Sequence, residues 1–182
     1  MTPDKPALRA RIRAERALFV AGNPPAIEPP PQFLARLTHG LTIASYVPVR
    51  GEADPSSLAR AAVERGCAIV LPHVTSRSEP MRFLAWDSED DLHPGPFGLP
   101  QPHHESPVLA PDIILTPLVA FDSRLDRLGQ GAGHYDRAFA QFPDAWRVGV
   151  AWSMQQVESL PAEPWDVPLH AVVTERGWIT PA

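Results

Sequence analysis

The strongest constraint on the fold is a strand–helix–strand unit between residues 42 and 72. Residues 42–47 (TIASYV) and 67–72 (CAIVLP) are apolar runs typical of buried strands. Between them, residues 56–65 predict a helix that ends at Gly66, a residue suited to a C-terminal cap. Strands joined by a crossover helix lie parallel in their sheet. The unit therefore predicts an α/β protein built on a mainly parallel sheet.

Apolar runs elsewhere continue this alternation of helices and strands. We expect further helices over residues 4–20, 133–142 and, as a short one, 154–160, and further strands over 81–86, 112–121, 147–152 and 170–174. Residues 23–31 (NPPAIEPPP) predict a stiff linker, and residues 93–111 predict a long loop. The length of 182 residues suits a single domain over residues 1–182.

Composition excludes several classes of protein. An apolar content of 44% excludes a disordered chain, and a net charge of −5 argues against a nucleic-acid binder. Cys67 is the only cysteine, so neither an internal disulfide nor an all-cysteine zinc site can form. No apolar run approaches the roughly 18 residues of a membrane span, and no apolar stretch follows the first basic residues. We therefore expect a cytoplasmic protein without a membrane or nucleic-acid partner.

The predicted N-terminal helix carries a basic stripe beside an apolar face. The stripe consists of Lys5, Arg9, Arg13 and Arg16, and the apolar face of Leu8, Ile12 and Phe19. Lys5 is the only lysine among 16 basic residues. Two interpretations stay open at this point: a solvated face, or an arm that clamps an anion.

The most informative segment is RLGQGAGHYDR, residues 127–137. Three alternate glycines, Gly129, Gly131 and Gly133, follow a predicted strand and open a predicted helix. Glycines let backbone N–H groups approach a ligand, and a helix N-terminus favours phosphate. The spacing fits neither the dinucleotide fingerprint nor the P-loop. An ordinary glycine-rich turn is the alternative, but Arg127 before the glycines and Asp136 after them favour a phosphate and magnesium site.

This segment resembles the hallmark loop of the 5-formyltetrahydrofolate cyclo-ligases, or methenyltetrahydrofolate synthetases, which has the form R-[LF]-G-x-G-x-G-Y-Y-D. Residues 127–136 follow that pattern, except that His134 replaces the first tyrosine. The resemblance extends to an N-terminal Lys-x-x-x-Arg pair, to FGLPQP at residues 97–102, and to PWDVPLHAVVT around Asp166. It implies a three-layer α/β/α sandwich with a mainly parallel, Rossmann-like central sheet.

The resemblance also implies the reaction and the residues that perform it. The family uses ATP and Mg²⁺ to phosphorylate the formyl oxygen of 5-formyltetrahydrofolate, and ring closure then gives 5,10-methenyltetrahydrofolate. Lys5 and Arg127 are the implied catalytic residues, and Asp136 and Asp166 the implied metal ligands. The implied ATP-binding residues are Lys5, Arg9, Arg127, Leu128, Gly129, Gln130, Gly131, Ala132, Gly133, His134 and Tyr135. The implied binding residues for the reduced folate are Val47, Glu52, Phe97, Gln130 and His134. We expect a monomer.

Alternatives remain for individual residues and for the function. Cys67 is expected to be a packed thiol, because it lies in a predicted strand. The adjacent His103, His104 and Glu105 are either mobile surface or a metal site, and Phe97 either stacks on a pterin ring or packs against the protein. Rival functions are phosphate or CoA transfer on the same fold, and a regulatory protein that binds nucleotide or folate without turnover.

Overall fold

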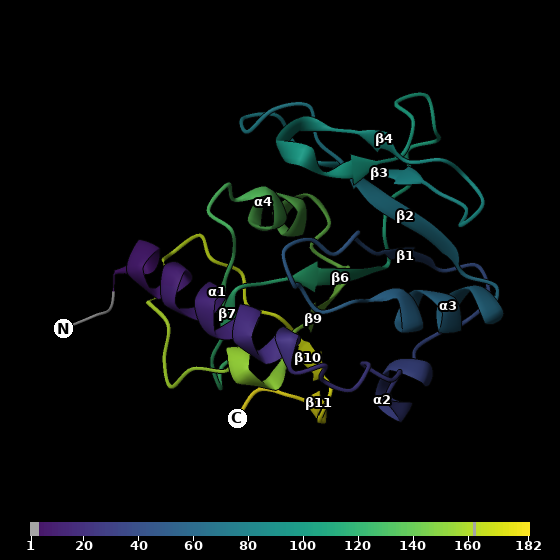
Figure 1. Cartoon of the computed structure of the whole chain (residues 1–182). Helices are drawn as coiled ribbons and strands as arrows, with labels where there is room; N and C mark the ends of the chain where they lie inside the picture. The colour runs from purple at the N-terminus through teal and green to yellow at the C-terminus, as the bar shows by residue number, and fades with distance from the viewer. Residues whose placement is uncertain (1–3, 162) are drawn as a thin grey trace.

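The computed structural model describes residues 4–161 and 163–182. Over these residues, seven strands form one sheet in the order β11-β10-β9-β6-β1-β2-β3 (Figure 1). The strands are β1 (Thr42–Ala44), β2 (Ala68–His73), β3 (Arg82–Ala85), β6 (Ile113–Pro117), β9 (Trp146–Val150), β10 (Ala171–Thr174) and β11 (Gly177–Ile179). The helices are α1 (Lys5–Ala21), α2 (Pro31–Leu34), α3 (Ser56–Glu64) and α4 (His134–Gln141). No helix of the described chain is long and apolar enough to cross a membrane.

The middle of the sheet is parallel, which confirms the predicted architecture. Strand β1 pairs in parallel with β2 and with β6, and β6, β9 and β10 continue the parallel series. The edge strands β3 and β11 run antiparallel to their neighbours. After β1 the chain adds β2 and β3 on one side of it. The later strands β6, β9, β10 and β11 then lie on the other side. The carboxyl ends of β1 and β6 therefore flank the switch point at which open α/β sheets bind ligands.

Helices cover both faces of the sheet, as the three-layer prediction requires (Figure 1). Ile113 and Leu115 face one layer with Leu58 of α3, whereas Ile114 faces the other with Phe139 of α4. Successive side chains of β6 thus enter opposite cores, which explains why its sequence is apolar without alternation. Buried Cys67 belongs to the first of these cores, so the predicted packed thiol is confirmed.

The predicted strand over residues 112–121 is interrupted. Strand β6 ends at Pro117, and Ala120–Phe121 forms β7, which pairs antiparallel with β8 (Arg127–Leu128). Proline has no N–H to donate, so a ladder ends readily at this position. The resulting β7–β8 hairpin leads directly into the glycine-rich segment. Because of this interruption, the predicted binding loop follows a separate two-stranded hairpin and not a strand of the main sheet.

Several smaller boundaries also differ from the prediction. Residues 154–160 form only a 3₁₀ turn at Ser153–Gln155, because Val157 N–H donates to the Phe121 carbonyl at 2.8 Å instead of continuing a helix. The predicted strand over 42–47 ends at Ala44. The predicted loop over 93–111 contains a small hairpin of β4 (His93–Pro94) and β5 (Pro100–Gln101). Strand β11 lies beyond the predicted strands.

Candidate functional site

The glycine-rich loop connects β8 to α4. Gly131 and Gly133 have φ angles of 109° and 70°, a region of backbone conformation that favours glycine. Gly133 is also the residue at which α4 is capped. The loop therefore needs glycine at these two positions to turn from the hairpin into the helix, and it leaves backbone N–H groups at the N-terminus of α4.

Helix α1 lies against this loop. Leu8 and Ile12 are buried with Leu128 of β8, which fixes the helix over the β7–β8 hairpin. Arg9 Nε donates to the Gly129 carbonyl at 2.8 Å, and Arg13 donates to the side-chain oxygen of Gln130. The N-terminal arm thus closes onto the predicted phosphate loop. Burial, with a smaller contribution from neighbouring Arg13, lowers the pKa of Arg9.

Arg16, the last residue of the basic stripe, is buried. Its side chain is 2% exposed, and its Nη2 donates to the Arg50 carbonyl at 3.0 Å. Among the residues that the structure describes, its Nε and Nη1 have no hydrogen-bond partner. Burial lowers the pKa of Arg16, and the nearby Glu52 carboxylate partly opposes this. The solvated-face interpretation of the stripe is therefore wrong at Arg16, which instead holds the turn after β1.

Glu52 lies in that turn and reaches the glycine-rich loop. Its Oε2 accepts the Val49 N–H at 3.1 Å, and its Oε1 accepts the side-chain amide of Gln130 at 3.1 Å. Burial raises the pKa of Glu52, and these two hydrogen bonds lower it. Burial, followed by the charge of Glu52, raises the pKa of Tyr46 and of Tyr135. The turn after β1 and the loop before α4 therefore meet at one carboxylate.

Arg127 and Asp136 form a close ion pair at the end of the loop. Arg127 Nη2 lies 2.6 Å from Asp136 Oδ1, and the arginine side chain is only 5% exposed. Its guanidinium also stacks 5.0 Å from the centre of the Phe139 ring. Burial lowers the pKa of Arg127, against the opposing charges of Asp136 and Asp166. In the described chain, Arg127 Nε is buried without an acceptor. This atom is available to an anion.

Lys5 stands beside Asp166, although the two are 161 residues apart. Lys5 Nζ lies 3.4 Å from Asp166 Oδ2 and 3.7 Å from Glu163 Oε1. Asp166 also raises the pKa of Arg127, although less than Asp136 does. The structure thus pairs each predicted catalytic cation with one of the predicted metal ligands, Arg127 with Asp136 and Lys5 with Asp166. Each carboxylate is engaged by a cation through one of its two oxygens.

His134 and Phe97 are connected only indirectly. Arg137 Nη2 lies 3.0 Å from His134 Nδ1 and donates to the Arg77 carbonyl at 2.9 Å. Phe97 is 51% exposed, and the Arg77 guanidinium lies 5.4 Å from the centre of its ring. Phe97 therefore lies outside the core and contacts the protein through Arg77, so both interpretations of this residue stay open. Burial and the charge of Arg137 lower the pKa of His134.

The remaining predicted residues take backbone or supporting positions. Leu128 is buried in β8, and the Ala132 carbonyl accepts Arg137 Nη1 at 3.0 Å. Val47 is half-buried in the loop after β1. Sequence reasoning missed Tyr46 and Arg137 as neighbours of the site. A polar side chain at the carboxyl end of a parallel strand was a usable signal for Tyr46.

A cavity of about 430 Å³ lies elsewhere, beside Asp112, Ile113 and Trp146 at the amino ends of β6 and β9. Ligands of open α/β sheets bind outside the carboxyl ends of the strands. This cavity therefore adds nothing to the candidate site, which lies at the opposite ends of the same strands.

Comparison with known proteins points to one family for this chain. The model of the 5-formyltetrahydrofolate cyclo-ligase family matches residues 1–175. The 5-formyltetrahydrofolate cyclo-ligase of Escherichia coli (strain K12) is 36% identical over 141 residues, covering 73% of this chain and 77% of that protein. Two solved 5,10-methenyltetrahydrofolate synthetases have the same fold. The Aquifex aeolicus structure matches with a TM-score of 0.72 and 28% identity, over 97% of this chain and 92% of its own. The Mycoplasma pneumoniae structure matches with a TM-score of 0.69 and 26% identity, over 95% and 99%.

Proposed function

Because the chain belongs to the 5-formyltetrahydrofolate cyclo-ligase family, we propose that it converts 5-formyltetrahydrofolate to 5,10-methenyltetrahydrofolate with consumption of ATP and a requirement for Mg²⁺. The observation that carries the proposal is the pairing of Arg127 with Asp136 at a glycine-rich helix N-terminus, together with the pairing of Lys5 with Asp166. Phosphoryl transfer depends on positioning and on charge neutralisation more than on a covalent nucleophile. These two pairs supply both.

The residues present fit the triphosphate of ATP. The buried Arg127 Nε has no acceptor within the described chain, and Arg9 already lies on the loop. Lys5, Arg9 and Arg127 would neutralise phosphate charge, and backbone N–H groups of residues 129–135 would bind phosphate oxygens at the start of α4. Leu128, Gln130, Ala132, His134 and Tyr135 would complete the nucleotide site. Lys5 and Arg127 are the proposed catalytic residues because their charges would stabilise the transferred phosphoryl group.

Asp136 and Asp166 fit magnesium as a pair of single-oxygen ligands. Mg²⁺ usually keeps several waters and binds through one or two carboxylates together with substrate phosphates. Asp136 Oδ1 is paired with Arg127 and Asp166 Oδ2 with Lys5, which leaves one oxygen of each carboxylate for the ion. When bound, Mg²⁺ would neutralise part of the phosphate charge.

The proposed reaction balances without a covalent enzyme intermediate. The formyl oxygen takes the terminal phosphoryl group and ADP leaves. A neighbouring folate N–H nitrogen then attacks the formyl carbon, its proton passes to the departing phosphate or to water, and the carbon–oxygen bond breaks to release phosphate. This chain would orient the folate through Val47, Glu52, Phe97, Gln130 and His134. Glu52 suits the N–H and amino edge of a pterin, since a carboxylate can accept bonds beyond the two that it has now.

An absorbance assay for methenyltetrahydrofolate tests the proposal. The full chain should form product only when 5-formyltetrahydrofolate, ATP and Mg²⁺ are all present. Omission of each in turn is the control. Product formation without ATP, or none under any condition, would overturn the proposal.

His134 favours one alternative, a protein of the same fold that binds nucleotide or folate without turnover. The imidazole stands where the family motif has tyrosine, and its Nδ1 lies 3.0 Å from Arg137 Nη2. Tight binding of both ligands without product would select this alternative. The presence of Lys5, Arg127, Asp136 and Asp166 argues against it, because binding alone has little need of all four.

We further propose that the protein acts in the cytoplasm as a monomer, with reduced folate as its small-molecule partner. The acidic net charge of −5 and the single buried cysteine support this assignment. Light scattering on the eluting protein measures its mass, and a value of twice 19.9 kDa would contradict the monomer.

A further inference from the structure

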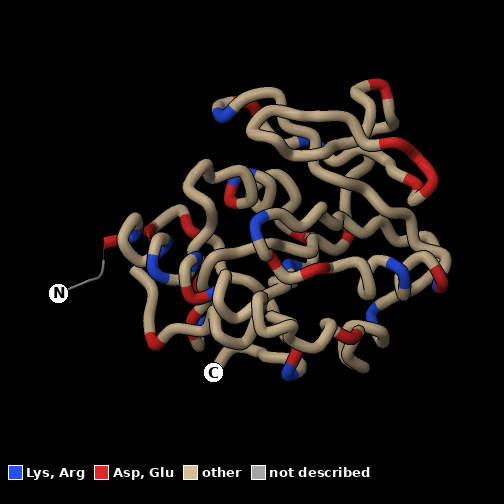
Figure 2. Tube along the Cα trace, viewed as in Figure 1, with Lys and Arg blue, Asp and Glu red and all other residues tan. Residues whose placement is uncertain are grey.

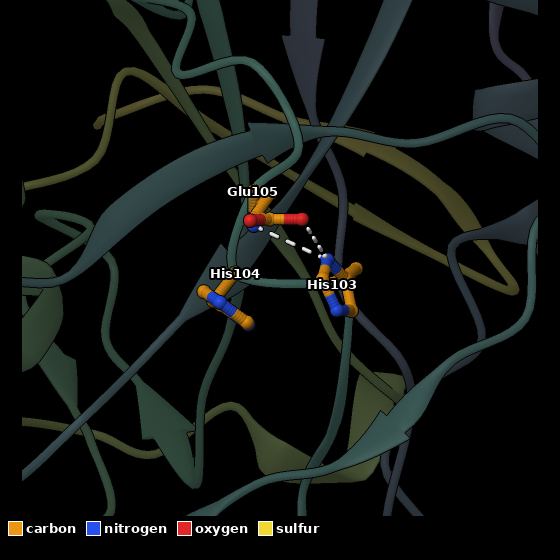
Figure 3. Close-up of side chains that lie close together, drawn as sticks. All are labelled: His103, His104 and Glu105. Carbon is orange, nitrogen blue, oxygen red and sulfur yellow. Dashed lines mark hydrogen bonds and ion pairs between the residues drawn. The ribbon is translucent and has the colours of Figure 1, made fainter.

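A cluster of histidines and one carboxylate lies on a surface that the proposed reaction does not use. His103, His104 and Glu105 are all exposed, and one ligand atom from each lies within 4.8 Å of the others. Figure 3 shows the His103 ring turned toward the Glu105 carboxylate, with His104 beside it. Across residues 4–161 and 163–182, these side chains form the one group of three or more metal-ligating residues at such spacing.

A third imidazole belongs to the same corner of the molecule. The ring centres of His93 and His103 lie 5.2 Å apart, and those of His103 and His104 lie 4.3 Å apart. His93 begins β4, and its pairing partner in β5 is Gln101, two residues before His103. Three of the seven histidines of the chain thus meet at the base of the β4–β5 hairpin.

We propose that His103, His104 and Glu105, with His93 as the fourth ligand, bind one divalent cation of the Zn²⁺ type. Imidazole and carboxylate are the ligands that Zn²⁺ takes in tetrahedral sites. His103 Nδ1 already lies 3.8 Å from Glu105 Oε2. An ion with bonds of about 2.0–2.2 Å could contact both atoms, in place of the 3.3 Å hydrogen bond that His103 Nδ1 now accepts from the Glu105 N–H. A ligand atom of His104 already lies within 4.8 Å of the other two, whereas the exposed His93 ring would have to turn to reach the ion.

The surroundings of the cluster favour a cation. Asp90 and Asp91 line a cavity of about 220 Å³ together with His93 and His103. Figure 2 shows the acidic loop after β3 on this side of the molecule. A concentration of negative charge raises the local concentration of cations. The cavity gives the ion a path to the imidazoles, and the acidic loop offers further oxygen contacts.

The proposed ion would tie together the two ends of the hairpin. His93 lies before the turn and His103 after it, and the turn itself is the 3₁₀ segment Pro96–Gly98 that carries Phe97. Binding would therefore restrict the motion of the segment between the two histidines. This site goes beyond the proposed function, and its occupancy is measured without nucleotide or folate.

Titration of the untagged full chain with Zn²⁺ alone tests the site. Calorimetry should report one equivalent bound to the wild-type chain. His103→Ala and His104→Ala should each weaken binding by at least about tenfold, as expected for loss of a metal contact. His39→Ala is the matched control, since His39 is an exposed histidine outside the cluster. It should bind Zn²⁺ as the wild type does.

A second measurement guards against an effect of misfolding. Zn²⁺ should raise the Tm of the wild-type chain and of His39→Ala, and leave the Tm of His103→Ala unchanged. The metal-free Tm of all three should agree, because the substituted side chains are exposed. Absence of Zn²⁺ binding by the wild type, or equal loss in His39→Ala and His103→Ala, would overturn the proposal.

Discussion

The side-chain amide of Gln130 donates a hydrogen bond to Glu52 Oε1 at 3.1 Å, across 78 residues of sequence. This bond joins the glycine-rich loop before α4 to the turn after β1. It therefore spans the switch point between β1 and β6, where an open α/β sheet binds its ligands. Under the proposed function, one bond connects the nucleotide loop to the residue that recognises folate.

Glu52→Gln should weaken folate binding and leave ATP binding unchanged. A charge-assisted hydrogen bond contributes about 1.5–3 kcal/mol, so the folate Kd should rise roughly 10- to 150-fold. The one glutamine carbonyl can still accept the Gln130 amide, so the nucleotide loop keeps its contact with the turn, while the Val49 N–H loses its side-chain acceptor. Equilibrium titration of the variant with each ligand separately measures both effects.

Asp54→Asn is the control for this variant. Asp54 is an exposed carboxylate of the same turn, and its Oδ1 accepts the Ser56 N–H, which an asparagine oxygen can also do. It should bind both ligands as the wild type does. An unchanged folate affinity in Glu52→Gln, or an equal fall in ATP affinity, would show that Glu52 only shapes the turn.

Glu52 should also make stability depend on pH. Burial raises its pKa above the ordinary value of 4.5 in spite of its two hydrogen bonds. The folded protein therefore holds this proton more tightly than the unfolded chain. The associated stability is present below the unfolded pKa and is lost as the pH rises through the folded pKa. Glu52→Gln removes this titration.

The difference in free energy of unfolding, Glu52→Gln minus wild type, should therefore increase between about pH 4 and about pH 7, because only the wild type loses stability as Glu52 ionises. Urea denaturation of both proteins at the two pH values measures it, with Asp54→Asn as the comparison. A difference that stays constant or falls over this range contradicts a raised pKa at Glu52.

Asp136→Asn should remove most of the activity through loss of a magnesium ligand. It should also destabilise the fold by about 1–3 kcal/mol. The asparagine oxygen can still accept a hydrogen bond from the buried Arg127, but it carries no negative charge to pair with the guanidinium. Activity measured as a function of Mg²⁺ concentration, together with urea denaturation, separates the two effects.

Asp144→Asn provides the matched control for Asp136→Asn. Asp144 is an exposed carboxylate after α4, beside the cavity at the amino ends of β6 and β9 and therefore away from the candidate site. Its Mg²⁺ dependence should match the wild type. If Asp136→Asn retains wild-type activity at low Mg²⁺, Asp136 is a structural partner of Arg127 and nothing more.

Sequence periodicity predicted the elements that bury apolar residues on a regular repeat. The parallel pairing of β1 and β2 and the helix α1 are confirmed, because each has a local pattern of its own. The break at Pro117 was not predicted, since the apolar run continues through it to Phe121. The short strand β11, Gly177–Ile179, pairs with β10 at the edge of the sheet. A local sequence pattern does not show which edge of a sheet is available for pairing.

The site shows the same division between local and long-range information. The glycine spacing predicted a loop that leads into a helix, and the structure adds that Gly131 and Gly133 have positive φ angles there. The acceptor of Arg9, the Gly129 carbonyl, lies 120 residues along the chain, so only the fold reveals that contact. Arg16 was placed on a basic stripe, but its burial depends on the turn at Arg50 packing over it. Tertiary contacts therefore decided which basic residues are exposed.

Lys5→Ala should raise the KM for ATP and leave the fold intact. Lys5 is 26% exposed and lies 3.4 Å from Asp166 Oδ2, and a pair with this exposure contributes roughly 0–1 kcal/mol to stability. Loss of its charge from a phosphate site removes a charge-assisted contact, so the KM should rise about tenfold or more. Initial rates at varied ATP concentration measure this change.

Arg11→Ala is the control for Lys5→Ala. It tests whether removal of any positive charge from α1 raises the KM for ATP, or only removal of the charge at the site. Arg11 belongs to the same helix, but its exposed guanidinium pairs with Glu15 at 3.2 Å, away from the glycine-rich loop. Its substitution should leave the KM for ATP unchanged, because no phosphate charge loses a partner. If both variants raise the KM equally, the helix has only a general electrostatic effect. If Lys5→Ala lowers the Tm and leaves the KM unchanged, Lys5 anchors α1 to Asp166 and does not bind nucleotide.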